Sequence, residues 1–184
     1  MHARKILALE GEWDKKLTHT ESVAPALQFL QQVYEIPYVH RRVPTKDAFL
    51  YYLNWGVKEG FRILYLGGHG EKEGLHMGSE ESGTVTLADI ETCLAGRLGY
   101  NDVVVHFGTC GLIQPGNRAI QAFKGSTKAR LVSGYTQDID FLDSMLLDMA
   151  WFSFLQGKGA FDATGDFVKG KYARLGKELG FVVI

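Results

Sequence analysis

The 184 residues of this chain are 46% hydrophobic and 22% charged, which suits one globular domain built around one well-formed core. Twenty basic and 21 acidic side chains give a formal net charge of -1. Because no long run of lysine and arginine is present, we expect no nucleic-acid partner. The two cysteines, Cys93 and Cys110, form no Cys-x-x-Cys pair. A disulfide framework or a zinc site is therefore disfavoured, and we expect neither a metal nor a cofactor.

The start of the chain has a few apolar residues between Ile6 and Leu9, followed by acidic residues from Glu10 onward. This run is too short for the core of a signal peptide. No stretch of the sequence approaches the length of a membrane-spanning helix. We therefore expect a soluble, cytoplasmic protein without a membrane partner.

Hydrophobic periodicity predicts strands and helices in alternation, as in an α/β protein with helices on both faces of a sheet. Ser22 and Thr45 precede two helical patterns and are the expected N-caps. In this first part of the chain we predict strands at 5–9 and 38–43, a helix at 22–34, and a helix that follows Thr45 and ends at Gly60.

The rest of the chain continues the alternation, with a polar, glycine-rich interruption at 71–83 that we interpret as a small hairpin or lid. The densely apolar segment 141–155 indicates a core helix. The last strand would lie at a sheet edge with its backbone unpaired. The predicted strands are 63–66, 103–107, 129–132 and 181–184, and the predicted helices are 86–98, 115–123, 141–155 and 167–179.

Two glycine-bounded turns directly follow two of these apolar strands: GGHG at 67–70 and GTCG at 108–111. If the two strands are parallel neighbours, both turns leave the sheet at the same edge. The imidazole of His69 and the thiol of Cys110 would then face each other across a crevice. A thiol nucleophile needs such a neighbouring base, because the thiolate is the reactive form.

Chain order restricts which histidine can serve as the partner of Cys110. All six histidines precede Cys110, whereas papain-like proteases and class I glutaminases place the histidine after the nucleophile. His69 has the most suitable setting, because flanking glycines allow a sharp turn and the close approach of a ligand. His106 lies within a strand and is interpreted as a core histidine, and His76 as an exposed residue of the hairpin.

The strings YLGGHG and VVVHFGTCG resemble the His-Gly and cysteine signatures of the caspase-like fold, shared by caspases, gingipains, separases and bacterial CHAT domains. The segment 131–155 is also similar to the strand and helix that border the substrate cleft in CHAT domains and caspases. The resemblance covers residues 4–184 and is strongest to CHAT-like domains. It implies a three-layer α/β fold, with a mostly parallel six-stranded sheet, helices on both faces and a small hairpin after the third strand. The caspase pentapeptide around the cysteine is not matched.

The resemblance implies a cysteine peptidase that acts on a peptide or protein substrate. Cys110 would attack the peptide carbonyl, and His69 would protonate the leaving amine and then activate water. The expected oxyanion donors are the backbone N–H groups of Cys110 and of Gly68 or Gly70.

The same resemblance implies that substrate specificity resides after the strand that begins near Leu131. Tyr135, Gln137, Asp138 and Asp140 are the substrate-binding candidates there, and an acidic lining would favour lysine or arginine. For Asp138 and Asp140 the alternative is a cap on the following helix. Glu10, after the first strand, is a weaker acidic candidate.

Two other classes of function stay open at this point. The chain could be a catalytically silent caspase-like module that binds a partner, because fold and activity separate readily. Pairing of the C-terminal edge strand in a homodimer also stays open. A phosphate or nucleotide site at 67–70 is disfavoured, since neither Gly-x-Gly-x-x-Gly nor Gly-Lys-Ser/Thr occurs.

Overall fold

A computed structural model describes residues 3–12, 21–71, 74–78, 83–99, 102–113 and 118–184. Six strands form one sheet in the order β2-β1-β3-β7-β8-β9. The first five are parallel neighbours, and β9 pairs antiparallel with β8 at the edge. The strands are β1 (Ile6–Glu10), β2 (Tyr38–Arg42), β3 (Ile63–Gly67), β7 (Val104–Gly108), β8 (Leu131–Tyr135) and β9 (Phe181–Val183). The predicted α/β class and the mostly parallel six-stranded sheet are confirmed.

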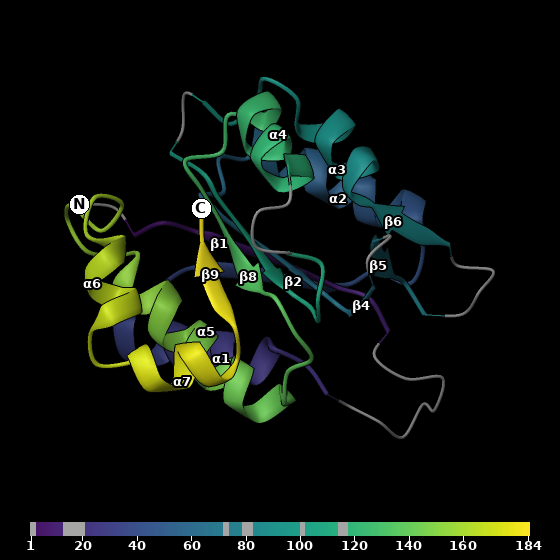
Figure 1. Ribbon diagram of the computed structural model, residues 1–184. Helices are drawn as coiled ribbons and strands as arrows, with labels where there is room; N and C mark the ends of the chain where they lie inside the picture. The colour runs from purple at the N-terminus through teal and green to yellow at the C-terminus, as the bar shows by residue number, and fades with distance from the viewer. Residues whose placement is uncertain (1–2, 13–20, 72–73, 79–82, 100–101, 114–117) are drawn as a thin grey trace.

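Helices lie on both sides of this sheet (Figure 1). One side carries α2 (Lys46–Lys58), α3 (Leu87–Leu94) and α4 (Arg118–Thr127). The other side carries α1 (Ala24–Tyr34), α5 (Phe141–Phe154), α6 (Thr164–Lys169) and α7 (Ala173–Glu178). None of the described helices is long and apolar enough to cross a membrane.

The central strands are apolar on both faces, because each face is covered by helices. Alternate residues of β1 and β3 belong to two separate cores. Leu7, Leu9 and Leu64 pack with α2, α3 and α4, whereas Ile6 and Ile63 pack with α1 and α5. This explains why the strands read as continuous hydrophobic runs in the sequence.

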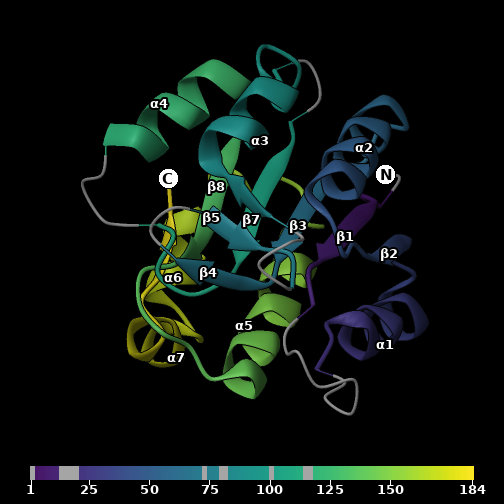
Figure 2. The ribbon, with the colours of Figure 1, turned by 90° about the vertical axis from the view of Figure 1, so that its right-hand side faces the viewer.

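A second, three-stranded antiparallel sheet follows β3: β4 (His69–Glu71), β5 (Gly74–His76) and β6 (Thr84–Thr86). Its β4 and β5 strands lie at the centre of the view in Figure 2, between the two helical layers. The sequence predicted only a two-stranded hairpin within 71–83. His69 therefore belongs to a strand of the small sheet rather than to an open turn.

Several predicted boundaries and roles were wrong. The N-cap of α1 is Val23 rather than Ser22 and has no side-chain cap bond, although Ser22 Oγ accepts from the Ala24 amide at 3.1 Å. The helix predicted at 86–98 ends at Leu94, and the one predicted at 167–179 is divided into α6 and α7, with Gly170 between them. Thr45 does cap α2, as predicted, by accepting from the Ala48 amide. Pro115 lies outside the described residues.

The helix at 141–155 is confirmed as α5, but it is not buried all round. Leu142 and Leu146 are 58% and 45% exposed, while Asp148 in the same helix is 2% exposed. The apolar composition of the segment concealed an inward-facing acid. This acid contributes to the site described next.

Candidate functional site

The two glycine-bounded turns leave the main sheet side by side. β3 and β7 are parallel neighbours, and their last residues, Gly67 and Gly108, are register partners. His69 follows the first strand end by two residues and Cys110 follows the second by two. The predicted convergence of these two loops on one edge of the sheet is therefore confirmed.

The two loops are also in close backbone contact. A Cβ atom built on Gly70 would lie 2.6 Å from the carbonyl oxygen of Cys110 and 1.7 Å from Thr109 Oγ1. Both separations are far below van der Waals contact, so only glycine fits here. The absence of a side chain at Gly70 lets β4, which carries His69, pack directly on the segment that carries Cys110.

His69 and Cys110 line one small cavity of about 100 Å³. The side chain of His69 is exposed and that of Cys110 is half-buried, so a ligand can reach both from solvent. The other lining residues come from the segment before α1, from the two strand ends and from the start of α5. They are Glu21, Val23, Tyr65, Gly108, Ile139, Phe141, Ser144, Met145 and Asp148.

The Tyr65 ring occupies the space above the two strand ends. A Cβ on Gly108 would lie 2.4 Å from the Tyr65 hydroxyl, and a Cβ on Gly67 would lie 2.5 Å from the ring. Burial, with the negative charges of Asp148 and Glu10, raises the pKa of Tyr65 well above its usual value. Tyr65 therefore presents a neutral hydroxyl at the cavity wall.

A buried polar chain lies behind the cavity and ends on Asp148. The Tyr135 hydroxyl donates to Asp148 Oδ1 at 2.5 Å, and His106 Nε2 lies 2.9 Å from the same oxygen, although the ring N–H is not aligned for a regular hydrogen bond. His106 Nδ1 contacts Ser133 Oγ at 2.9 Å, and the Trp151 indole N–H donates to that hydroxyl at 3.0 Å.

This polar chain connects β7 and β8 to α5 within the interior. His106, Ser133 and Tyr135 are all fully buried. Burial, then the charge and hydrogen bond of Asp148, raises the pKa of Tyr135 well above its usual value. Tyr135 thus remains a donor to Asp148. The expectation that His106 is a core histidine is confirmed.

A second buried carboxylate fixes the segment that enters α1. Glu10 is fully buried at the end of β1 and accepts from Ser22 Oγ at 2.6 Å, the Val23 amide at 2.8 Å and His40 Nε2 at 2.5 Å. Burial alone would raise the pKa of Glu10, but these hydrogen bonds outweigh it and hold the pKa below the usual value. Since Val23 lines the cavity, Glu10 positions one of its walls.

The four residues predicted to bind substrate do not line this cavity. Asp140 caps α5 by accepting from the Asp143 amide at 3.0 Å. This confirms the alternative role, a helix cap, that the sequence offered for Asp140. Gln137 donates to the backbone carbonyl of Glu178, and Asp138 is exposed. Tyr135 lies beneath the cavity and contributes through its bond to Asp148.

Of the three residues predicted to supply oxyanion donors, Cys110 lines the cavity, whereas Gly68 and Gly70 are not among its lining residues. Gly68 has φ of +147° at the bend between β3 and β4, a conformation that glycine adopts readily. Gly70 pairs with Leu75 of β5. Cys110 lies two residues past the end of β7 and is followed by Gly111, with φ of +59°.

Sequence reasoning missed the residues that shape the cavity: Tyr65, Ser144 and Asp148. Asp148 carried a readable signal, because it is a charged residue in an otherwise apolar helical stretch and such residues are seldom buried without a partner. Tyr65 carried none, since an aromatic residue within an apolar strand is ordinary core. The second cysteine, Cys93, packs against the core and burial raises its pKa, which suits an inert thiol.

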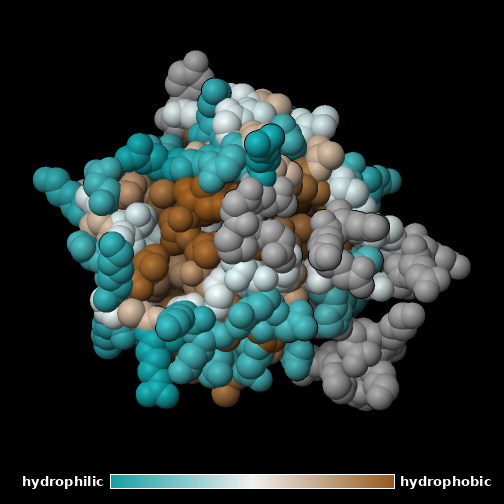
Figure 3. Space-filling view, viewed as in Figure 1, coloured by the Kyte–Doolittle hydropathy of each residue, from teal (hydrophilic) through white to brown (hydrophobic). Residues whose placement is uncertain are grey.

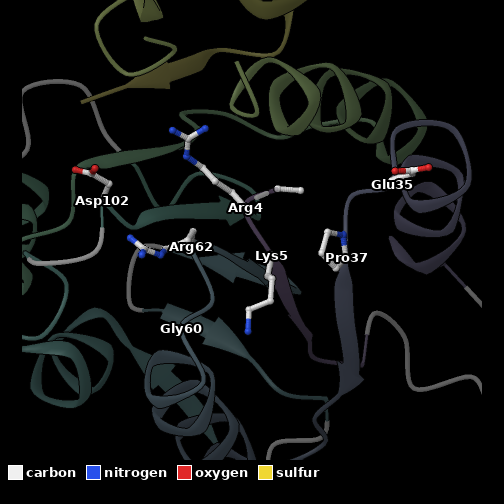
Figure 4. Close-up of a pocket in the computed structure, with 8 residues that line it drawn as sticks. Arg4, Lys5, Glu35, Pro37, Gly60, Arg62 and Asp102 are labelled. Atoms are coloured by element: carbon white, nitrogen blue, oxygen red, sulfur yellow. The ribbon is translucent and has the colours of Figure 1, made fainter. Parts of the chain in front are cut away.

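A larger, open hollow of about 680 Å³ lies at the opposite edge of the sheet, where β1 and β3 begin (Figure 4). Arg4, Lys5 and Arg62 line it, but Figure 4 shows Arg4 and Lys5 pointing away from each other. The Arg4 guanidinium donates to the Leu155 carbonyl and Lys5 to the Glu59 carbonyl. These cations do not converge on a common point, so the hollow is not built as an anion site.

Among the described residues, no group of three or more His, Cys, Asp or Glu side chains could hold a metal ion.

A family model, "Family of unknown function (DUF6642)", matches residues 3–184. The chain belongs to this family. No curated protein matches it. Among solved structures, it is similar to the apo form of an NADH:FMN oxidoreductase (EMOB), with a TM-score of 0.47 and 14% identity over 85% of this chain and 91% of that chain.

Proposed function

We propose that this protein is a cysteine peptidase-like hydrolase in which His69 and Cys110 act as a dyad on a peptide bond. The observation that carries the proposal is that both side chains line one solvent-accessible cavity at the ends of two adjacent parallel strands. In parallel sheets, ligands bind in the crevice beyond the carboxyl ends of the strands. The proposal includes a caspase-like arrangement of the fold, with CHAT-like domains as the nearest resemblance, and a cytoplasmic location.

The proposed reaction is thiol acyl transfer. The Cys110 thiol transfers its proton to His69, and Sγ attacks the carbonyl carbon to give a tetrahedral oxyanion. The carbon–nitrogen bond then breaks as the His69 imidazolium gives its proton to the leaving amine. Water, deprotonated by His69, attacks the thioester, and the Cys110 thiolate leaves.

Backbone amides would stabilise the oxyanion formed in both steps. We assign this role to the N–H of Cys110, which lines the cavity, together with the N–H of Gly68 or Gly70, the two glycines that flank His69. Oxyanion donors of this kind contribute about 10²- to 10³-fold in rate. Tyr65 adds a neutral hydroxyl in the same wall.

Selective thiol labelling tests the dyad without knowledge of the substrate. Iodoacetamide is reacted with the intact chain, and the modification of Cys110 and Cys93 is followed by mass spectrometry of peptides. We expect Cys110 to react at least tenfold faster in the native chain than in His69→Ala, because the imidazole supplies the base that forms the thiolate. Cys93, half-buried with a raised pKa, serves as the internal control and should not change.

A partner-binding module without catalysis is the second candidate, favoured by the edge strand β9. Figure 3 shows an apolar area with hydrophilic margins at the place that β9 occupies in Figure 1. Under this alternative, Cys110 is labelled slowly and at the same rate in His69→Ala. That outcome would exclude the dyad.

A further inference from the structure

We infer that the cavity beside Cys110 accepts a lysine side chain of the peptide substrate, and that Asp148 is the residue that selects it. This inference rests on the proposed function, because it places the lysine next to the bond that Cys110 attacks. It assigns specificity to α5 and to the segment before α1, rather than to the loop 136–140.

The walls of the cavity suit an aliphatic stem. Four apolar side chains line it: Val23, Ile139, Phe141 and Met145. Val23 belongs to the hydrophobic core next to α1 and α5, and Ile139 and Met145 pack against that core. Phe141 is the first residue of α5. The cavity volume of about 100 Å³ leaves room for a side chain. Lysine places its methylene stem against apolar surface while its ammonium seeks a polar partner.

Asp148, the acidic residue in the cavity wall, is a buried carboxylate with contacts to only one of its two oxygens in the described residues. Asp148 is 2% exposed, and both Tyr135 and His106 approach its Oδ1. The other oxygen, Oδ2, makes no hydrogen bond with any residue in the described parts of the chain. Burying a carboxylate oxygen without a hydrogen-bond donor costs folding free energy. The ammonium of an incoming lysine supplies that donor.

The polar chain behind Asp148 is consistent with a charged carboxylate. His106 Nε2 lies 2.9 Å from Asp148 Oδ1 without a regular hydrogen bond, and Ser133 can donate to His106 Nδ1 while it accepts from the Trp151 indole. Neither contact requires a proton on Asp148. Glu21, exposed at the cavity rim, adds a second negative charge, which disfavours an acidic occupant.

The single available oxygen favours lysine over arginine. A guanidinium binds a carboxylate best through two parallel hydrogen bonds, one to each oxygen. At Asp148 the Tyr135 hydroxyl and His106 already occupy Oδ1. An ammonium is a compact point charge with three rotatable donors and needs only one oxygen.

The test compares peptide acyloxymethyl ketones, which alkylate an active-site thiol, with lysine, arginine, norleucine or glutamate at the position that enters the cavity. Norleucine keeps the lysine stem and lacks the charge. Rate constants for alkylation of Cys110 are measured by mass spectrometry. We expect the lysine probe to react about tenfold to a hundredfold faster than norleucine, the range typical of one charged hydrogen bond, with arginine slower than lysine and glutamate slowest.

In Asp148→Asn, the preference for lysine over norleucine should fall at least tenfold, while Asp138→Asn, an exposed acid outside the cavity, should keep it. If Asp148→Asn does not fold, the probe series on the native chain decides alone. Equal rates for lysine and norleucine, with Cys110 labelling still dependent on His69, would overturn the inference and leave the proposed dyad standing. Iodoacetamide labelling that is indifferent to His69 would remove the dyad, and the inference with it.

Discussion

The backbones of Gly70 and Cys110 are in such close contact that a side chain at Gly70 would not fit. A Cβ atom at Gly70 would lie 2.6 Å from the Cys110 carbonyl oxygen. This contact joins the strand that carries His69 to the loop that carries the thiol. The geometry of the dyad therefore depends on a residue without a side chain. Its replacement is the most direct test of the joined loops.

We expect Gly70→Ala to reduce the His69-dependent labelling of Cys110 at least tenfold, because the added methyl group must push the two loops apart. Overpacking of this kind also costs about 1 to 3 kcal/mol of unfolding free energy, measured by urea denaturation. Gly125→Ala is the matched control. Nothing lies within 4 Å of its Cβ position on α4, so it should be neutral or slightly stabilising. Unchanged labelling in a folded Gly70→Ala protein would contradict the prediction.

Glu10→Gln should destabilise the fold by about 1 to 3 kcal/mol near neutral pH, since it weakens a buried carboxylate that accepts three hydrogen bonds. The folded-state pKa of Glu10 is lowered. Its contribution is therefore complete above the unfolded pKa of about 4.3 and is lost as pH falls through the lower folded value. The stability gap between native and variant should shrink as the pH is lowered below about 4.

Urea denaturation between pH 3 and 7 measures that gap. Glu178→Gln is the control, because the exposed Glu178 carboxylate pairs with Arg174 along α7 and with no other group in the described residues, and the change should alter stability by less than about 0.5 kcal/mol. If the difference in unfolding free energy between the native chain and Glu10→Gln widens toward low pH, the lowered pKa assigned to Glu10 is wrong.

Ser133→Ala should cost about 2 to 4 kcal/mol, because its hydroxyl contacts both His106 Nδ1 and the Trp151 indole N–H in the interior. Removing it leaves two buried polar groups without that partner, and each such group costs about 1 to 3 kcal/mol. Thermal denaturation provides the measurement. In Ser126→Ala, the lost hydroxyl donates to the Phe123 carbonyl of its own helix and to no other group in the described part of the chain, so a small effect is expected. Equal effects of the two substitutions would argue against the buried polar chain.

The main sheet, and the position of turns 67–70 and 108–111 at one of its edges, could be predicted because both follow from short sequence patterns. Apolar runs bounded by glycines mark buried strands, and parallel strands bring the ends of neighbouring strands to one edge. For the same reason the convergence of His69 and Cys110 on one cavity could be predicted from the sequence alone. The cap at Thr45 was equally local, as one hydroxyl serves an amide three residues later.

The cavity itself could not be predicted, because its walls come from segments that only tertiary packing brings together. Ser22 illustrates this: its position favours a helix cap, and its hydroxyl accepts from the Ala24 amide, but it also donates to the buried Glu10 carboxylate, twelve residues earlier. Asp148 likewise depends on Tyr135 and His106 from two other elements. No periodicity within α5 reports those partners.

The C-terminal edge strand leads to the last prediction, a homodimer formed by pairing of β9 with β9 of a second copy. Ile184 and Val132 exchange two backbone hydrogen bonds, so alternate residues of β9 face β8. In the antiparallel pattern, Val183 is then a non-hydrogen-bonded partner of Ser133, and its N–H and carbonyl point away from β8. An edge of this kind is a template for another strand.

We expect sedimentation equilibrium at high protein concentration to show a dimer that Val183→Pro abolishes, because proline removes the outward N–H without removing a bond between β8 and β9. Val182→Pro is the contrasting variant. Its N–H faces β8, since Val182 lies two residues from Ile184, so it should lower the stability of the subunit itself. A monomer at every concentration would exclude this interface, as would a dimer that persists in folded Val183→Pro.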